Sequence, residues 1–208
     1  MRGPLAPLFD TCQFVSDVSG AGNNWAVGYM EYGDKYIDAI EESVRTAAER
    51  CDSLQTFVVM HSLSGGTGSG LGTRVLSILS DTYPDVFRCS SVVMPGEVDD
   101  VVTAPYNTGF ALRELIEQSD CVIPLDNDAL AAAAERAMGK SQVKRGSEAS
   151  DKEGDAKSNV AQMTKSKLPF DTMNSIAAHM LSNLTCSLRF PGSLNMDINE
   201  IATNLVPY

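Results

Sequence analysis

The chain has 208 residues, of which 43% are hydrophobic, and its formal net charge is −11 at pH 7. This length and composition suffice to bury a substantial core, as one domain or as one domain with an appendage. The negative charge argues against nucleic acid or an anionic membrane surface as the main partner, because both would repel the chain at long range. Any phosphate group must therefore be bound by local groups of the protein.

Cysteine usage and the first residues set further limits. The five cysteines lie far apart without a C-x-x-C pair, and there are only two histidines. Neither a zinc site nor a disulfide framework is indicated, and buried reduced thiols are the better interpretation. The sequence has no apolar run long enough to span a membrane, and residues 1–10 lack the basic-then-apolar order of a signal peptide. We therefore expect a soluble protein of the cytoplasm.

Short apolar runs alternate with longer amphipathic runs along the chain. The pattern predicts, in turn, helix, strand, helix, strand, helix and strand over residues 33–52, 56–61, 69–83, 87–95, 106–118 and 121–126. Apolar strands such as residues 57–60 need cover on both faces, and alternation with helices implies right-handed crossovers in a parallel sheet. We predict an α/β fold, a Rossmann-like parallel sheet flanked by helices. Ligands of such sheets bind beyond the carboxyl ends of the strands, where loops 62–68, 95–105 and 126–128 begin.

The composition changes in the second half of the chain. Residues 139–167 are rich in Lys, Ser, Gly, Asp and Glu, which predicts a charged mobile insertion. A basic docking patch is the weaker interpretation, because acidic residues dilute the lysines. The sheet domain would then cover residues 1–138 and resume over 168–208, with an amphipathic helix over 170–190 that leads into a short strand, and a further helix near the end.

The most specific feature is the glycine-rich segment "SLSGGTGSG" that follows the strand 56–61. It is not a Walker A loop, because Leu71 rather than a lysine follows Gly70. It is not a dinucleotide fingerprint either, because the third glycine position, counted from Gly68, is Thr73. Only Glu97 would be available as the carboxylate that such a fingerprint places on a ribose.

Two interpretations of the glycine segment are left. Its backbone N–H groups could surround an oxyanion at the start of the following helix, where the helix dipole favours negative charge, with the hydroxyls of Thr67 and Ser69 as extra donors. Alternatively, the glycines only allow the helix and strand to pack closely.

Four polar or aromatic residues elsewhere are candidates for contact with a nucleoside. Asn127 follows a strand and could offer its amide to a ribose or base edge, or else cap the helix 128–138. Asp100 could accept from a sugar hydroxyl or be an ordinary turn aspartate. Asn174 lies four residues after Phe170, so both share one helix face, where the ring could stack on a purine and the amide could read its edge. By composition alone Phe170 would be a core residue.

Two carboxylates lie near the end of the chain, at the start of a predicted helix. Asp197 and Glu200 are three residues apart, so they project to one side and could polarise a water for attack on a phosphate. An acidic N-cap with a glutamate three residues later is also close to a capping box, and physical chemistry alone favours that interpretation.

Six sequence blocks in the same order resemble the tubulin family and its bacterial relative FtsZ, in which a loop similar to "GGTGSG" wraps the phosphates of GTP without a lysine. The other five blocks are "GAGNNWAVGY" (20–29), "VVTAPYN" (101–107), "LDNDAL" (125–130), "PFDTMN" (169–174) and the run 189–208. The resemblance implies a tubulin-type nucleotide-binding domain that is incomplete here, with its first strands before Met1 and a second domain after Tyr208.

This resemblance also implies roles for the candidate residues. It implies GTP with Mg²⁺ as cofactors, and other tubulin subunits rather than nucleic acid or membrane as partners. The residues implied to contact the nucleotide are Ser62, Gly65, Gly66, Thr67, Gly68 and Ser69 at the phosphates, Gly22 and Asn23 at the outermost phosphate, Asp100 at the ribose, and Asn127, Phe170 and Asn174 at the sugar and base. Residues 189–208 would reach the nucleotide of the next subunit, where Glu200, with Asp197, could promote hydrolysis.

Departures from the family pattern bear on the branch. Ser64 replaces the usual leading glycine, Ala104 stands where microtubule-lattice members commonly carry glutamate, and Phe170 where the family usually has tyrosine. With the insertion 139–167, these departures most resemble the epsilon branch, whose members belong to centrioles and basal bodies; the delta branch is the nearer competitor. The loss of a glutamate at Ala104 implies weaker ribose binding. A structural tubulin with little hydrolysis and a nicotinamide oxidoreductase are the alternative functions.

Overall fold

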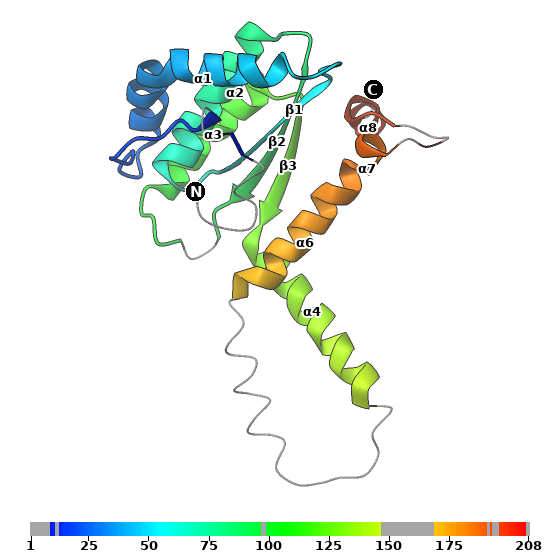
Figure 1. Ribbon diagram of the computed structural model, residues 1–208. Coiled ribbons are helices and arrows are strands. Elements are labelled where there is room, and N and C mark those ends of the chain that lie inside the picture. Colours follow the sequence, from blue (N-terminus) through cyan, green and yellow to red (C-terminus); the bar gives the residue numbers. More distant parts are fainter. Residues whose placement is uncertain are drawn as a thin grey trace. The chain divides into compact units, whose positions relative to one another are not determined.

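A computed structural model describes residues 9–10, 13–96, 99–146, 169–190, 192 and 196–206 of the chain, without the side chains of 137–146 and 169 (Figure 1). Its contacts divide the chain into two compact units, Met1–Pro124 and Leu125–Tyr208.

The first unit is built on the predicted parallel sheet. Three strands, β1 (Thr56–Ser62), β2 (Phe87–Met94) and β3 (Cys121–Asp126), lie in the order β1-β2-β3. Strands β1 and β2 are parallel, in register from Thr56 opposite Phe87 to Ser62 opposite Val93. The central strand β2 is the most deeply buried, as expected for a strand with neighbours on both edges. The predicted α/β fold and the three strand positions are confirmed.

Helical segments cover one face of this sheet. They are the π-helical turn η3 (Val27–Tyr32), α1 (Gly33–Ala48), the π-helical turn η4 (Thr67–Leu71), α2 (Gly72–Thr82) and α3 (Ala104–Gln118). Figure 1 shows α1, α2 and α3 together on one side of the strands. The core beneath them consists of Leu63, Leu76, Val92, Ala111 and Leu115.

Strand β1 departs from the prediction that both faces of the strands are covered. Val58 is 42% and Met60 68% exposed. Their neighbours Phe57 and Val59 are partly buried, and Val59 packs against the core under the helices. The expectation of cover on both faces is therefore wrong for β1 within the first unit, because the described helices of this unit lie on only one side of it.

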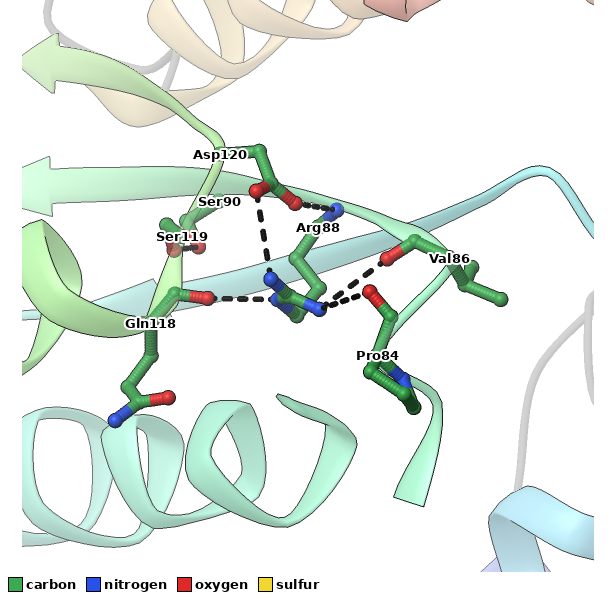
Figure 2. A network of polar contacts seen from close by, with 7 residues as sticks. All are labelled: Pro84, Val86, Arg88, Ser90, Gln118, Ser119 and Asp120. Atoms are coloured by element: carbon green, nitrogen blue, oxygen red, sulfur yellow. Dashed lines mark hydrogen bonds and ion pairs between the residues drawn. The ribbon is translucent and has the colours of Figure 1, made fainter. Parts of the chain in front are cut away.

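The amino ends of β2 and β3 are joined by a polar network around Arg88 (Figure 2). The Arg88 guanidinium forms an ion pair with Asp120 at 3.4 Å, and the Asp120 carboxylate accepts from the Arg88 main-chain N–H at 2.8 Å. The guanidinium also donates to three main-chain carbonyls, those of Pro84, Val86 and Gln118. A hydrogen bond of 2.6 Å between the Ser90 and Ser119 hydroxyls lies beside it. The network ties the end of α3 to the sheet, at the end away from the glycine loop.

The second unit is helical. It contains α4 (Asn127–Gly146), α6 (Pro169–Leu184), α7 (Cys186–Arg189) and α8 (Ile198–Leu205), and α4 contacts α6. Helix α4 continues through residues 139–146, the first part of the predicted insertion, so the helix is longer than the predicted 128–138. Residues 147–167, the rest of that segment, lie outside the described residues.

The short strand predicted at the end of residues 170–190 is wrong, because the chain stays helical there as α7. Local side-chain bonds favour this path. The Thr185 hydroxyl donates to the Leu181 carbonyl at 2.9 Å, and the Arg189 guanidinium donates to the Ser182 carbonyl at 2.6 Å. These bonds add side-chain donors to carbonyls at the end of α6, where the Leu181 carbonyl also accepts from the Thr185 N–H at 3.0 Å.

Cysteine burial agrees only in part with the prediction. Cys89 is buried, whereas Cys51 and Cys186 are exposed, and these residues and Cys121 are free thiols. Burial, with Cys121 nearby, raises the pKa of Cys89 to about 12, so this thiol stays protonated near neutral pH. Among the described helices, none has both the length and the apolar character that a membrane crossing requires.

Candidate functional site

The glycine loop leaves the carboxyl end of β1, as predicted. The Leu63 N–H still bonds to the Val93 carbonyl at 3.0 Å, and the chain then turns into η4, which starts at Thr67. Within the described residues, the backbone N–H groups of residues 64–68 take part in no hydrogen bond. A row of unpaired amides at the start of a helix is the arrangement that binds anions.

Close packing explains three of the loop glycines. A methyl group at Gly66 would lie 2.5 Å from the Asn24 nitrogen, and one at Gly68 would lie 2.6 Å from the Ser62 carbonyl oxygen. A methyl group at Gly70 would collide with the Trp25 carbonyl. The alternative that these glycines allow close packing is therefore correct for all three. It does not compete with anion binding, because the packing brings residues 20–29 against the loop.

Gly65 differs from the other three glycines. The nearest atom to a methyl group there would be Asn23 Oδ1, at 3.8 Å, so the space around Gly65 is open. Gly22 and Asn23 have φ angles of 59° and 54°, and asparagine is among the few residues that adopt this left-handed conformation readily. The turn leaves the exposed Asn23 side chain beside Gly65, and the two segments predicted to surround phosphates are therefore adjacent.

Hydroxyl groups of the loop divide into two kinds. Ser69 is fully buried, and both its hydroxyl and its N–H donate to the Gly65 carbonyl. Its hydroxyl thus stabilises the turn from inside. The sequence had suggested instead that this hydroxyl donates to a ligand. Ser62 and Thr67 are exposed, so the hydroxyls available to a ligand are theirs.

Asn107 is the residue that sequence reasoning missed. It lies in the first turns of α3, is 3% exposed, and was quoted only within the block "VVTAPYN". Its Oδ1 accepts from the Trp25 N–H at 2.9 Å, and its Nδ2 donates to the Asn23 and Ser64 carbonyls, each at 2.9 Å. The Thr103 hydroxyl donates to the same Asn23 carbonyl at 2.6 Å. A polar residue on the buried face of a helix that starts beside the loop was the available signal.

An aromatic cluster holds the 20–29 segment against the helices. The Trp25 ring stacks on Tyr29 with centroids 4.6 Å apart and lies 5.2 Å from Phe110. Its Nε1 donates to the Thr73 hydroxyl at 3.3 Å, and that hydroxyl donates to the Ser69 carbonyl at 2.6 Å. The loop thus rests on a packed support, which is what a preorganised site needs.

The loop before α3 contains Asp100, the predicted ribose contact. Asp99 is its turn-forming aspartate, because its carboxylate accepts from the Val101 N–H at 3.0 Å, whereas Asp100 is exposed. Ala104 is buried at the helix start. A cavity of about 510 Å³ opens beside this loop. Glu97, the loose candidate for a ribose carboxylate, lies outside the described residues.

His61 lies one residue before the end of β1 and directly under the loop. Burial lowers the pKa of His61, and both ring nitrogens are buried without a hydrogen-bond partner in the described chain. The imidazole is therefore neutral near pH 7 and adds no positive charge to the site.

In the second unit, the predicted nucleoside contacts differ in exposure, because Asn127 is partly buried whereas Phe170 and Asn174 are exposed. The Asp126 carboxylate, and not Asn127, caps α4, because it accepts from the Asp128 N–H at 2.9 Å. The alternative role of Asn127 as the cap is therefore wrong. Phe170 is 56% exposed and Asn174 is exposed on the same helix, so the interpretation of Phe170 as a core residue is also wrong.

The carboxylate pair at α8 does not form a capping box. Asp197 occupies the N-cap position in extended conformation, with φ −77° and ψ 155°, but its side chain makes no capping hydrogen bond. Asp197 and Glu200 are both exposed, whereas Ile198 between them is buried. Within the described part of the chain, no three His, Cys, Asp or Glu side chains come together as a metal site.

Comparisons with known proteins agree with this geometry. Residues 2–135 match the family model described as the GTPase domain of the Tubulin/FtsZ family. The chain is 47% identical over 209 residues to the tubulin epsilon chain of Homo sapiens, and the aligned region covers 100% of this chain and 44% of that protein. It is 46% identical to the tubulin epsilon chain of Mus musculus, with the same coverage. The tubulin beta-1 chain of Chondrus crispus is 39% identical, over 97% of this chain and 39% of that protein. The chain spans less than half the length of these relatives.

Proposed function

Because the chain belongs to the tubulin/FtsZ family, we propose that it is a GTP-binding cytoskeletal protein of the epsilon-tubulin type. The observation that carries this proposal is the row of unpaired amides at residues 64–68, beside the open Gly65 and the Asn23 side chain. These groups can bind phosphate in a chain whose net charge is −11 and whose loop contains no lysine. Family membership removes the support for a nicotinamide oxidoreductase, which rested on the glycines and the alternating sheet alone.

The phosphates are assigned to backbone groups and exposed hydroxyls. In this proposal the N–H groups of Gly65, Gly66, Thr67 and Gly68 surround them, with Ser62 and Thr67 as hydroxyl donors. Ser69 stabilises the turn from within. Gly22 and Asn23 face the outermost phosphate, which is supported by the position of the Asn23 amide beside Gly65.

The nucleoside is assigned to four residues from the resemblance. Asp100 accepts from the ribose, and Asn127 contacts the sugar and base. The exposed Phe170 ring stacks on guanine while Asn174 reads its edge. Since Ala104 offers no carboxylate, ribose binding is weaker than in relatives with glutamate there.

Mg²⁺ is proposed as the companion of GTP. The described residues provide no acidic cage for it. Mg²⁺ usually keeps several waters and binds through phosphate oxygens and one or two carboxylates, so its binding here would depend on the nucleotide. When bound, it neutralises charge that develops on the phosphates during their transfer.

Hydrolysis is assigned to a contact between subunits. Asp197 and Glu200 are exposed and take no part in a capping box, so their carboxylates are available to orient a water at the nucleotide of a neighbouring tubulin subunit. The alternative is a structural subunit in which bound GTP is seldom hydrolysed. Phosphate release under assembling conditions decides between them: loss of release in Glu200→Ala but not in Asn199→Ala supports hydrolysis, and equal release in all forms supports the structural role.

The proposed cellular role rests on similarity to relatives that are named tubulin epsilon chains. The epsilon chains match this chain at 47% and 46% identity, above the 39% of the beta-1 chain. We therefore assign it to the epsilon branch, with a role in organising microtubules of centrioles or basal bodies. Its partners are other tubulin subunits at a longitudinal contact.

The experiment that tests the proposal is a nucleotide titration of the full-length protein. GTP should bind with clear preference over ATP, and Gly68→Ala should weaken GTP binding because its methyl group would meet the Ser62 carbonyl at 2.6 Å. Gly109→Ala is the matched control, since a methyl group there meets no atom within 4 Å. Equal affinity for GTP and ATP would contradict the proposal.

A further inference from the structure

We infer that Asn107 is a positioning residue for the nucleotide phosphates, which orients the amides of the glycine loop from behind. This inference rests on the proposed GTP site and adds to it a buried side chain that touches no ligand. Asn107 lies on α3, separated by 43 positions in sequence from Ser64, to whose carbonyl its Nδ2 donates at 2.9 Å.

Three consecutive carbonyls of the loop accept hydrogen bonds from buried residues. The Leu63 carbonyl accepts from the Thr108 hydroxyl at 3.3 Å, the Ser64 carbonyl accepts from Asn107, and the Gly65 carbonyl accepts from Ser69. All three donors are buried side chains or belong to a buried residue. The carbonyl row is therefore turned toward the protein interior.

The planar trans peptide converts this into an orientation of the amides. The carbonyl of each residue and the N–H of the next residue belong to one rigid peptide plane and point in opposite directions. Because the carbonyls of residues 63, 64 and 65 point inward, the N–H groups of residues 64, 65 and 66 point outward. Those three N–H groups belong to the row that has no hydrogen bond within the described residues.

Asn107 is the centre of this arrangement because it also holds the 20–25 turn, which lies beside the glycine loop. Its second Nδ2 hydrogen bond goes to the Asn23 carbonyl at 2.9 Å, and its Oδ1 accepts from the Trp25 N–H at 2.9 Å. One carboxamide thus uses two donors and one acceptor to hold the glycine loop and the 20–25 turn at a set distance. That distance determines whether Asn23 and the loop amides can reach the same phosphate.

No other side chain of similar size can replace this carboxamide. Aspartate keeps the acceptor for Trp25 but turns a second oxygen toward the Asn23 and Ser64 carbonyls. Leucine removes the bonds to the Trp25 N–H and the Ser64 carbonyl, and each such loss is costly, whereas the Asn23 carbonyl keeps the Thr103 hydroxyl as a donor. Alanine removes the same bonds and leaves space through which the two loops can shift.

The test compares Asn107→Ala, Thr108→Val and Ser90→Ala in the full-length protein, by affinity for GTP and for guanosine. Ser90→Ala is the control, because the buried Ser90 hydroxyl makes a hydrogen bond of 2.6 Å to Ser119, in the half of β2 away from the glycine loop. Thermal unfolding without nucleotide shows how far each change destabilises the fold.

We expect Asn107→Ala to weaken GTP binding by about tenfold or more and guanosine binding by much less. Thr108→Val, which releases one carbonyl of the row, should show the same preference at a few-fold loss, and Ser90→Ala should leave the ratio of the two affinities unchanged. Equal losses for GTP and guanosine in Asn107→Ala, or no loss, would overturn the inference while leaving GTP binding intact. Absence of GTP binding by the unchanged protein would remove the proposed function and the inference together.

Discussion

The imidazole of His61 lies against Gly72, where a methyl group would come within 2.9 Å of the ring. This contact places a titratable side chain between the last residues of β1 and the first turn of α2. Because the ring is buried, a charge on it is disfavoured, and the Gly68 and Ser62 backbones offset this only in part. The contact therefore links the pH of the solution to the support of the glycine loop.

The first prediction concerns the pH dependence of stability. Burial lowers the pKa of His61, so the unfolded chain binds this proton more readily than the folded chain. Stability should fall as the pH drops through the ordinary histidine value, about 6.5, and remain constant with respect to this group at higher pH. Urea unfolding at a series of pH values measures how the free energy of unfolding changes with pH. In His61→Phe this contribution to the pH slope should vanish, whereas His179→Phe, at an exposed position, should keep it. Identical slopes in all three proteins would contradict the prediction.

A second prediction concerns the contact between the glycine loop and the 20–25 turn. Gly66→Ala should destabilise the protein by about 1–3 kcal/mol, because its methyl group would lie 2.5 Å from the Asn24 nitrogen and 2.8 Å from its carbonyl oxygen. Gly109→Ala, in the open middle of α3, should instead stabilise it by about 0.5–1 kcal/mol. Chemical denaturation of both variants gives the comparison. A neutral Gly66→Ala would show that the two segments are not packed as described.

The Arg88 network gives a third prediction. Arg88 is 11% exposed in its side chain, so Arg88→Ala removes the cation beside Asp120 and the side-chain donor to three main-chain carbonyls, and should cost about 2–4 kcal/mol. Arg113→Ala removes an ion pair with Glu117 whose arginine is 73% exposed, and should change stability by less than about 0.5 kcal/mol. Denaturation midpoints test the pair of variants. Similar midpoints would mean that the network contributes no more than a surface ion pair.

A fourth prediction separates stacking from core packing at Phe170. Because this ring is exposed, Phe170→Ala should leave the unfolding midpoint nearly unchanged and weaken guanine nucleotide binding about two- to tenfold. Phe190→Ala, at another exposed ring, should change neither quantity by much. Calorimetric titration and thermal unfolding provide both readings. A large loss of stability without a change in affinity would show that the ring has a structural role.

Periodicity sufficed to predict the elements whose pattern is local. The strands β1, β2 and β3 and the helices between them follow from runs of apolar residues, and the glycine loop was placed correctly at the end of β1. The exposure of Val58 and Met60 did not follow, because it depends on which face the helices cover, and apolar strands look alike whether one or both faces are buried.

Residue roles in the candidate site depended on partners distant in sequence. Asn107 bonds to residues 43 to 84 positions away, so no local pattern marks it. The choice of Asp126 rather than Asn127 as the cap follows from where α4 begins, and boundaries shift by a residue or two in any sequence-based prediction. The sequence suggested Ser69 as a ligand donor. Its burial inside the turn depends on the packing of η4 on Trp25, which no local pattern reveals.

Backbone amide hydrogen exchange at residues 64–68 of the full-length protein tests the central claim most directly. These N–H groups have no hydrogen bond within the described residues, so they should exchange quickly without nucleotide. Saturating GTP should slow their exchange strongly, while guanosine, which has no phosphate, should slow it little. Exchange at these amides that stays equally fast in saturating GTP would contradict the account.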